Sequence, residues 1–443
     1  MRSRRTGLEA SESEGLLLLE ELVLKIPRER KLYTSQALCF LMIGHYLVDK
    51  WSLSTSIRVL LESGAKKFLG SCKRNRENRI SSNTSALSQA RTALSLESLN
   101  RVWSDLLSQL KGQELLWNNS RVKTIDGCSE QLKPLASLRK SYPPTTNQFG
   151  QSAYPVVQMT VLHDVLTGLA EDVEIDPLNG DDGSSELKQA AKIISRIESG
   201  TILVADRGFG ILQMVRRAQE RGVEVVFRLK EVMSKSLVGY AVESGVDIEI
   251  DWSPSKAELK SHPDWKPTDS VRGRLITSRV IAGEKEIFLT IFTTLGKEYS
   301  ASSILELYGR RWEIEGEIRD LKKTIGLSEL SARTAKMVQK EITAAIIAYN
   351  IVRAMILAAA KAHKVADPKR LSFKNAFIIV KETTWRLMEA PSAKERLHIL
   401  ERALYWIAVR ENKKRPGRSF PRTVFKKSQT YTSKKKNLEG VWV

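Results

Sequence analysis

Cysteine and histidine are scarce in this sequence, and their scarcity limits the cross-links and metal sites that the chain can form. The 443 residues include three cysteines, Cys39, Cys72 and Cys128, which lie far apart and lack the spacing of a zinc site. The five histidines form no closely spaced, metal-binding pair. These absences exclude a disulfide framework and a structural zinc domain, and they suit a reducing cytoplasm.

Long uninterrupted apolar runs are also missing. The segment at 16–27 (LLLLEELVLKIP) is broken by two glutamates, so it predicts an amphipathic helix rather than a secretory signal. Ala344–Ala360 is apolar but contains Asn350 and Arg353, which favour a buried helix of a soluble protein over a membrane span. No repeat of fixed period is visible, which argues against a solenoid.

Positive charge is what the sequence has in excess. Lysine and arginine number 71 against 51 acidic residues, for a formal net charge of +20. A field of that sign concentrates polyanions, so nucleic acid is the expected partner and a membrane surface the weaker alternative. The 42% hydrophobic content is enough for a sizeable core, and the length predicts two or three domains.

Changes of pattern along the chain predict four regions. Residues 1–115 look like a helical, DNA-binding N-terminal region, and 116–330 look like an α/β catalytic domain with a β-rich insertion at about 231–300. Helices follow over 331–409, and 410–443 form a basic tail that is expected to be extended and to bind polyanions.

A capping cluster, Asn83-Thr84-Ser85, opens one N-terminal helix and places Gln89 and Arg91 on it. These side chains suit contacts with DNA phosphates or bases. An ordinary solvated helix face explains them almost equally well, because composition and position carry the signal and no motif does.

The α/β region reads as strands and helices of a mixed sheet. The expected strands are 121–125, 153–164, 166–176, 201–205 and 223–228, with helices at 186–199 and 212–221 and insertion strands at 247–252, 274–281 and 287–293.

The stretch Ala301–Ile325 has apolar residues at helical spacing and predicts one continuous helix. Ser302 or Ser303 is expected to cap its start, and Gly326 its end. Tyr308, Glu315 and Lys322 are seven residues apart and form a second line beside the apolar one, while Arg311 lies in the apolar stripe itself. Ordinary surface ion pairs remain an alternative explanation of these polar residues.

Three acidic residues stand out by their surroundings. Asp126 and Asp206 each follow a predicted apolar strand and should lie at the carboxyl ends of the sheet, where ligands collect in open α/β folds. Glu315 lies on the later helix. Three converging carboxylates repel one another unless cations neutralise them, and two Mg²⁺ ions suit a phosphodiester displacement. Taken alone, an Asp before Gly more often forms a turn.

Three segments together resemble the DDE transposases of bacterial insertion sequences, specifically the insertion-sequence-four family. They are IDG, ADRGFG and YGRRWEIEGEIRDLK, which begin at Ile125, Ala205 and Tyr308. The family signature is Tyr, two residues, Arg, three residues, Glu, six residues, Lys. It falls on Tyr308, Arg311, Glu315 and Lys322 without a gap, and the resemblance extends through the YNIVR segment that ends at Arg353.

The resemblance implies a ribonuclease H-like fold with a β-strand insertion between the second Asp and the Glu. It also implies two Mg²⁺ ions, replaceable by Mn²⁺, held by Asp126, Asp206 and Glu315. A water would nick the element end and free a 3′-OH for strand transfer, by way of a DNA hairpin in well-studied relatives. Tyr308, Arg311 and Lys322 would hold phosphates near the cleaved end, and no nucleotide cofactor is required.

The implied partners are double-stranded DNA with terminal inverted repeats and target DNA, bound by a homodimer in the synaptic complex. The implied location is the nucleoid of a bacterial cytoplasm, with no membrane involvement. Arg207 is expected to contact a DNA phosphate or to steady the carboxylate of Asp206. An insertion aromatic would stack on an extruded base, and the candidates, each equally explicable as a core residue, are Trp252, Trp265 and Phe288.

Two other functions compete with an active transposase. One is a catalytically silent, transposase-derived DNA-binding regulator, and the other is a structure-selective nuclease of the same fold. The retained carboxylates argue against the regulator, because a pure DNA binder gains affinity by losing negative charge near phosphates.

Overall fold

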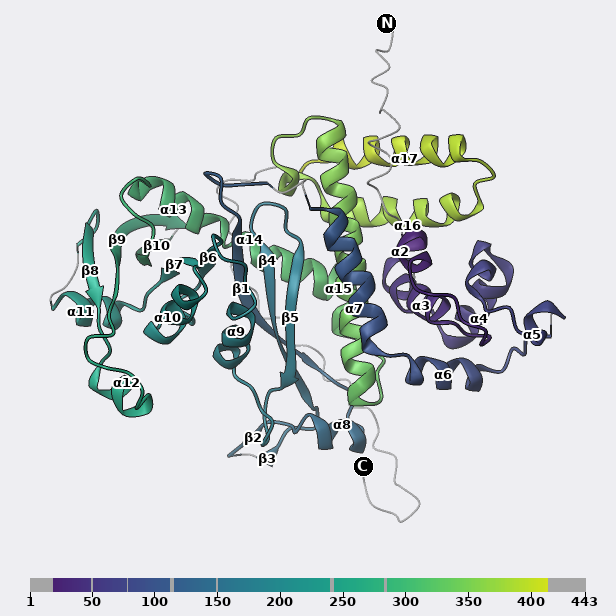
Figure 1. Ribbon diagram of the computed structural model, residues 1–443, viewed down its shortest axis with the longest axis horizontal. Coiled ribbons are helices and arrows are strands. Elements are labelled where there is room, and N and C mark those ends of the chain that lie inside the picture. The colour runs from purple at the N-terminus through teal and green to yellow at the C-terminus, as the bar shows by residue number, and fades with distance from the viewer. Residues whose placement is uncertain are drawn as a thin grey trace, which may run out of the picture.

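A computed structural model describes residues 19–412 of the protein, apart from 49–50, 78, 112–114, 149, 240–242 and 283–284 (Figure 1). From residue 413 onward, the predicted basic tail lies outside the described residues. The described chain forms a sheet with its own helices, and a helical body beside that sheet (Figure 1).

The central sheet has eight strands in the order β5-β4-β1-β6-β7-β10-β9-β8. β1, β6 and β7 run parallel to one another, and the remaining neighbours pair antiparallel. An antiparallel meander of three strands followed by two parallel strands is a ribonuclease H-like arrangement, so the predicted fold class is confirmed. The strands are β1 (Val122–Gln131), β4 (Val156–Asp164), β5 (Ala170–Pro177), β6 (Ile202–Ala205), β7 (Glu224–Arg228), β8 (Asp247–Trp252), β9 (Val271–Ala282) and β10 (Lys285–Thr293).

Both faces of the sheet are covered, which explains why β6 is apolar throughout. Leu203 and Ala205 face a core formed with α9 (Glu186–Ile194) and α10 (Leu212–Glu220). Ile202 and Val204 face the opposite side, where α13 (Ala301–Arg310) packs. Side chains alternate between faces along a strand, so a central strand covered on both sides needs apolar residues at every position.

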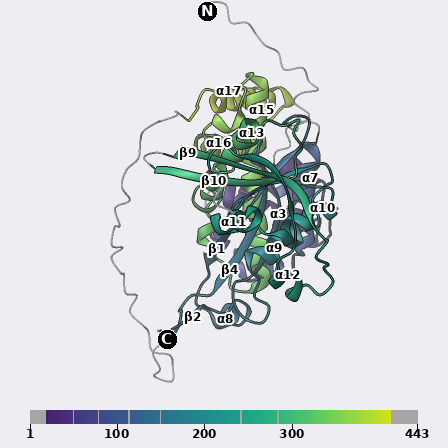
Figure 2. The ribbon, with the colours of Figure 1, turned by 90° about the vertical axis from the view of Figure 1, so that its left-hand side faces the viewer.

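The insertion strands are present, but they extend the main sheet. β10 pairs with β7 through Ile291, Phe292 and Thr293, and β9 and β8 follow outward from β10 (Figure 1). Figure 2 shows β9 and β10 running side by side. Two short helices, α11 (Glu231–Val238) and α12 (Lys256–Ser261), belong to the same insertion. The periodicity of the sequence predicted these strands, but their addition to the edge of the main sheet at β7 depends on long-range pairing.

The prediction that the first strand ends before Asp126 is wrong. β1 continues through Asp126 to Gln131. β4 pairs with β1 from Lys123 to Gln131, including Asp126↔Val161 and Gly127↔Thr160, so Gly127 is held in the ladder and forms no turn. The loop beyond β1 contains α8 (Ala136–Ser141) and a small hairpin of β2 (Thr146–Asn147) and β3 (Gly150–Gln151).

The single helix predicted over 301–325 is wrong. α13 ends at Arg310, α14 covers Glu313–Arg319, and the π-helical turn η2 covers Asp320–Thr324. The N–H groups of Arg311 and Trp312 bond to carbonyls three residues back, which tightens the chain beside Gly309 and separates the two helices. Ser300 caps α13 in place of the predicted serines, whereas Gly326 has the expected left-handed conformation at φ 92°.

Helices from both ends of the chain share one core around α15, as Figure 1 shows. α15 is long and apolar enough to cross a membrane by length and composition alone, but nearly all of its apolar window is buried inside the protein. The N-terminal helices are α2 (Leu19–Leu24), α3 (Ser35–Leu47), α4 (Leu53–Glu62), α5 (Lys73–Arg76), α6 (Thr84–Ala93) and α7 (Leu96–Gln109), and the C-terminal helices are α15 (Ala335–Ala362), α16 (Phe373–Glu389) and α17 (Ala393–Ala408).

Candidate active site

Asp126 and Asp206 lie side by side because their strands are adjacent and parallel. Thr124 of β1 pairs with Val204 of β6, and two residues further along the chain lie Asp126, still within β1, and Asp206, directly after the end of β6. Burial raises the pKa of Asp126, and the negative charges of Glu186 and Asp206 raise it further, against the N–H of Gly127 and the charge of Arg311, which lower it. The site therefore holds carboxylates whose mutual repulsion favours a bound cation.

Tyr308 covers the Asp206 side of this pair from α13. Its side chain is fully buried, and its hydroxyl donates a long hydrogen bond of 3.4 Å to Asp206 Oδ1. Burial raises the pKa of Tyr308, and the charge of Asp206 also raises it. The phenol therefore stays protonated and able to donate, to Asp206 or to a phosphate oxygen in its place.

Arg311 joins the elements of the site. It lies in the break between α13 and α14 and is only 5% exposed, in keeping with its place in the apolar stripe. Its guanidinium lies 5.8 Å from the centre of the Tyr308 ring, and its Nη2 lies 4.0 Å from Glu315 Oε1. Its charge also lowers the pKa of Asp126. This buried cation thus lies near Tyr308 and Glu315 and also acts on the charge of Asp126.

Glu315 lies near Arg311 but does not complete a metal site with Asp126 and Asp206. Its side chain is 71% exposed on α14 and is within reach of Arg311 at 4.0 Å. Within the described part of the chain, no three His, Cys, Asp or Glu side chains gather closely enough to hold a metal ion. The oxygen donors of Asp126, Asp206 and Glu315 suit Mg²⁺ chemically, but Glu315 must turn away from Arg311 to join the other two.

The remaining predicted residues lie in different settings. Lys322 on η2 contacts Glu130 Oε1 at 2.6 Å and donates to the Ser129 carbonyl at 3.1 Å, so it reaches back to β1 beyond Asp126. Arg207 is exposed directly after Asp206. Arg91 on α6 lies 3.6 Å from Glu341 of α15, within the helical body and away from the sheet. Its role in DNA binding stays a prediction.

Glu186 is a residue of this site that the sequence reading missed. It begins α9 and is exposed, and a Cβ on Gly127 would come within 2.3 Å of its Oε1 atom. Gln158 of β4 donates to the same oxygen at 3.2 Å. In the sequence, Glu186 looks like an ordinary acid in the first turn of a helix, and only the packing of α9 against β1 brings it near Asp126.

The three aromatic candidates of the insertion differ in their surroundings. Trp252 is 2% exposed and packs edge-on against Phe292 at 5.0 Å, so it is a core residue. Trp265 is stacked on His262 at 4.3 Å, with the Arg216 guanidinium 4.2 Å from its ring. Phe288 is partly buried on β10. Trp265 and Phe288 keep surface available, and Trp252 does not.

Comparisons with known sequences agree on one family. The model of the transposase DDE domain matches residues 123–351, a span that includes Asp126, Asp206 and Glu315. Transposase InsG for insertion sequence element IS4, from Escherichia coli (strain K12), is 22% identical over 374 residues, which cover 81% of this chain and 80% of that protein. A piggyBac transposase synaptic complex with hairpin DNA aligns over 92% of this chain and 84% of its own, at a TM-score of 0.38 and 12% identity.

Proposed function

Because the chain belongs to the transposase DDE domain family, we propose that it cleaves DNA at the ends of an insertion sequence and joins those ends to target DNA. Membership of the family makes it a DNA transposase. The cut-and-paste steps rest on one observation above all, which is that Asp126 and Asp206 lie side by side under Tyr308 and Arg311. This arrangement unites residues that are distant in the sequence at a single site.

Asp126, Asp206 and Glu315 are the residues that would hold two Mg²⁺ ions, with Mn²⁺ as a substitute. The fit rests on their hard oxygen donors and on the raised pKa of Asp126, which reflects burial and uncompensated negative charge. When bound, the metal ions supply Lewis-acid activation of a water and of the scissile phosphate. The chain contributes the movement of Glu315 from Arg311 toward the aspartates.

Tyr308, Arg311 and Lys322 would position the phosphates of the DNA end. Tyr308 offers a protonated hydroxyl, and Arg311 offers a buried guanidinium that Glu315 leaves free when it turns. Lys322 already contacts Glu130 and would exchange that carboxylate for a phosphate. Arg207 is exposed beside Asp206 and would add a contact to the DNA backbone.

The substrate that we propose is double-stranded DNA with terminal inverted repeats, synapsed by a homodimer and inserted into target DNA. The net charge of +20 supports a polyanionic partner. We place this activity at the nucleoid of a bacterial cytoplasm, in keeping with the relationship to the Escherichia coli transposase.

The test is cleavage of an end oligonucleotide or a supercoiled plasmid with Mg²⁺. We expect nicking that leaves a 3′-OH, followed by joined products with target DNA. Asp126→Ala, Asp206→Ala and Glu315→Ala should each abolish nicking while end binding persists. Absence of nicking by the wild type would favour the silent regulator, and nicking without joined products would favour the nuclease.

A further inference from the structure

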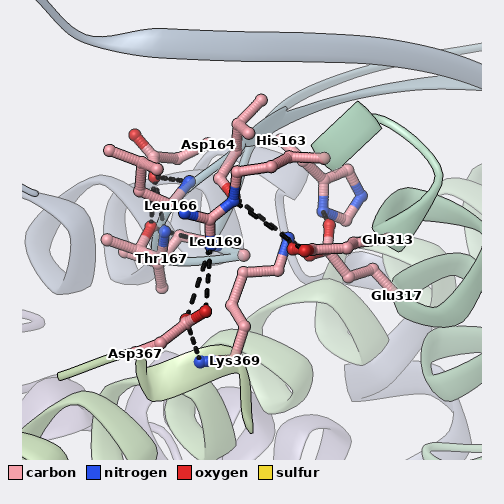
Figure 3. Close-up of polar contacts among 12 residues, drawn as sticks. His163, Asp164, Leu166, Thr167, Leu169, Glu313, Glu317, Asp367 and Lys369 are labelled. Atoms are coloured by element: carbon pink, nitrogen blue, oxygen red, sulfur yellow. Dashed lines mark hydrogen bonds and ion pairs between the residues drawn. The ribbon is translucent and has the colours of Figure 1, made fainter. Parts of the chain in front are cut away.

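A buried carboxylate lies on α14 close to Glu315 and outside the DDE set. Glu317 is 2% exposed, and its two oxygens face two bases from other parts of the chain (Figure 3). Lys369 Nζ lies 2.5 Å from Oε1, and His163 Nδ1 lies 3.2 Å from Oε2. A charged group in such a position is costly unless it is compensated, so this cluster calls for an explanation.

The cluster joins α14 to three other segments. Lys369 follows α15 and also contacts Glu313 Oε2 at 2.8 Å and donates to the Val165 carbonyl at 3.0 Å. Arg353 of α15 donates to the Tyr349 hydroxyl at 2.8 Å, and Tyr349 donates to the Gly168 carbonyl at 2.8 Å. The turn after β4, the segment around Lys369 and α15 therefore all meet the same face of α14.

Gly168 makes the close approach possible. Its φ is +73°, and a Cβ there would lie 3.0 Å from Glu317 Oε1 and 3.1 Å from the Arg353 guanidinium. A side chain at this turn would crowd both charged groups, so the absence of one allows the carboxylate and the guanidinium to pack against the same backbone.

The groups around Glu317 compensate its charge. Lys369 Nζ and His163 Nδ1 lie within ion-pair distance of its two oxygens, and the Arg353 guanidinium packs beside it at the Gly168 turn. Burial lowers the pKa of Arg353, and the charges of neighbouring groups, Glu317 among them, more than restore it. The cluster is thus an ion-pair network and does not rely on a neutral acid.

Few residues of α14 itself are buried. It contains seven residues, and only Ile314 and Glu317 are buried. Tight hydrogen bonds at Arg311 and Trp312 separate it from α13, and at its other end it continues directly into η2, where Leu321 is buried. A seven-residue helix is not stable by itself, so its orientation must come from η2 and from the contacts of its own buried face.

Glu315 and Glu317 lie on opposite faces of α14, since two residues correspond to about 200° of helical rotation. Glu317 is buried, and Glu315 is 71% exposed toward Arg311. We propose that Glu317, held by Lys369 and His163, is the positioning residue that sets where α14 presents Glu315 to the two aspartates. This inference rests on the proposed function for its catalytic consequence, but the placement of α14 can be measured without catalysis.

The experiment compares the full-length wild type with Glu317→Gln, Lys369→Met and Lys369→Arg. Glu306→Gln on α13, an exposed carboxylate outside the cluster, is the matched control. Hydrogen–deuterium exchange reports the protection of α14, and single-turnover cleavage of an end oligonucleotide over a Mg²⁺ series reports the metal requirement. Binding of the same oligonucleotide without metal and the thermal midpoint are measured in parallel.

We expect Glu317→Gln and Lys369→Met to speed amide exchange in α14 by about tenfold or more while the sheet stays protected. The Mg²⁺ concentration for half-maximal cleavage should rise by about tenfold or more, as for residues that support metal ligands, with unchanged DNA binding. Lys369→Arg keeps the ion pair and should restore both values. If Glu317→Gln does not fold, Lys369→Met tests the same ion pair from its other side.

Wild-type protection of α14 together with a wild-type Mg²⁺ requirement would overturn the proposal. So would faster exchange with unchanged cleavage, or a loss of cleavage that merely follows a loss of folded protein and DNA binding at every Mg²⁺ concentration. If the wild type does not cleave at all, the proposed function fails, and α14 exchange alone decides whether Glu317 fixes the helix.

Discussion

Lys322 Nζ lies 2.6 Å from Glu130 Oε1, so the cation predicted to hold DNA is paired with an acid of the protein itself. The Glu130 side chain is 9% exposed and that of Lys322 is 29% exposed, so the pair is shielded from water. A DNA phosphate that binds Lys322 must displace Glu130 or share the cation with it. We therefore expect the pair to oppose DNA binding at Lys322.

Glu130→Gln should tighten binding of end DNA, because it frees Lys322 and removes a negative charge beside the phosphates. We expect a severalfold gain in affinity, about 1 kcal/mol, that shrinks as salt is added.

Lys322→Ala should weaken DNA binding or synapsis more than it changes the Mg²⁺ requirement. Fluorescence anisotropy over a salt series measures both variants. Equal affinities for wild type and Glu130→Gln at low salt would contradict this role for the pair.

Asp126→Asn should stabilise the metal-free protein at neutral pH. The folded-state pKa of Asp126 lies above that of an unfolded Asp, so the folded protein holds this proton more tightly, and stability falls as pH rises through the raised pKa. Asparagine carries no charge at this position, so the variant does not lose stability as pH rises through that range. The thermal midpoint at pH 7 should rise, and the difference from wild type should disappear in acid, where Asp126 is protonated. Mg²⁺ should stabilise the wild type but not the variant.

Glu186→Gln should move the acid limb of the cleavage pH profile to lower pH. The charge of Glu186 is one of the causes that raise the pKa of Asp126, so its removal lets Asp126 ionise in more acidic solution. Cleavage rates at saturating Mg²⁺ from pH 5 to pH 8 measure the shift. Glu198→Gln, at an exposed carboxylate beside Arg121, is the control and should leave the profile in place. If the acid limb does not move, the charge of Glu186 does not influence the ionisation of Asp126.

Gly127→Ala tests the contact of β1 with Glu186 directly. The added Cβ would meet Glu186 Oε1 at 2.3 Å, so the carboxylate must swing away from Asp126 and Gln158. Because a flexible side chain is able to move, we expect a loss of about 1 kcal/mol or less. Glu186→Ala should suppress that loss, which appears as non-additivity in a double-mutant cycle by urea denaturation. Additive effects would mean that the two residues do not meet.

Trp252→Ala should cost about 3–5 kcal/mol of folding free energy, because it empties a buried aromatic site. Trp265→Ala should cost less, since that ring stacks on His262 and Arg216 near the surface. Chemical denaturation compares the two. If the Trp252 variant is as stable as wild type but is defective with DNA, Trp252 returns as a base-stacking candidate.

Local patterns in the sequence determined the strands, the terminal helices and the two aspartates of the site. β6 was readable because a strand covered on both faces has to be apolar throughout, and Asp206 follows its last residue. Parallel pairing with β1 then requires Asp126 to be its neighbour. These features depend on residues close together in the chain and on the regular geometry of a sheet.

Only the tertiary structure decided where the second half of the site lies. The apolar spacing of Ala301–Ile325 suits one long helix, yet tight hydrogen bonds at Arg311 divide it, and Glu317 and Lys322 bind partners more than forty positions away. The attachment of β10 to β7, the approach of Glu186 to Gly127 and the burial of Glu317 have the same origin. Periodicity reports which face of an element is apolar, whereas the partner of a buried charge is chosen by whichever distant segment packs against it.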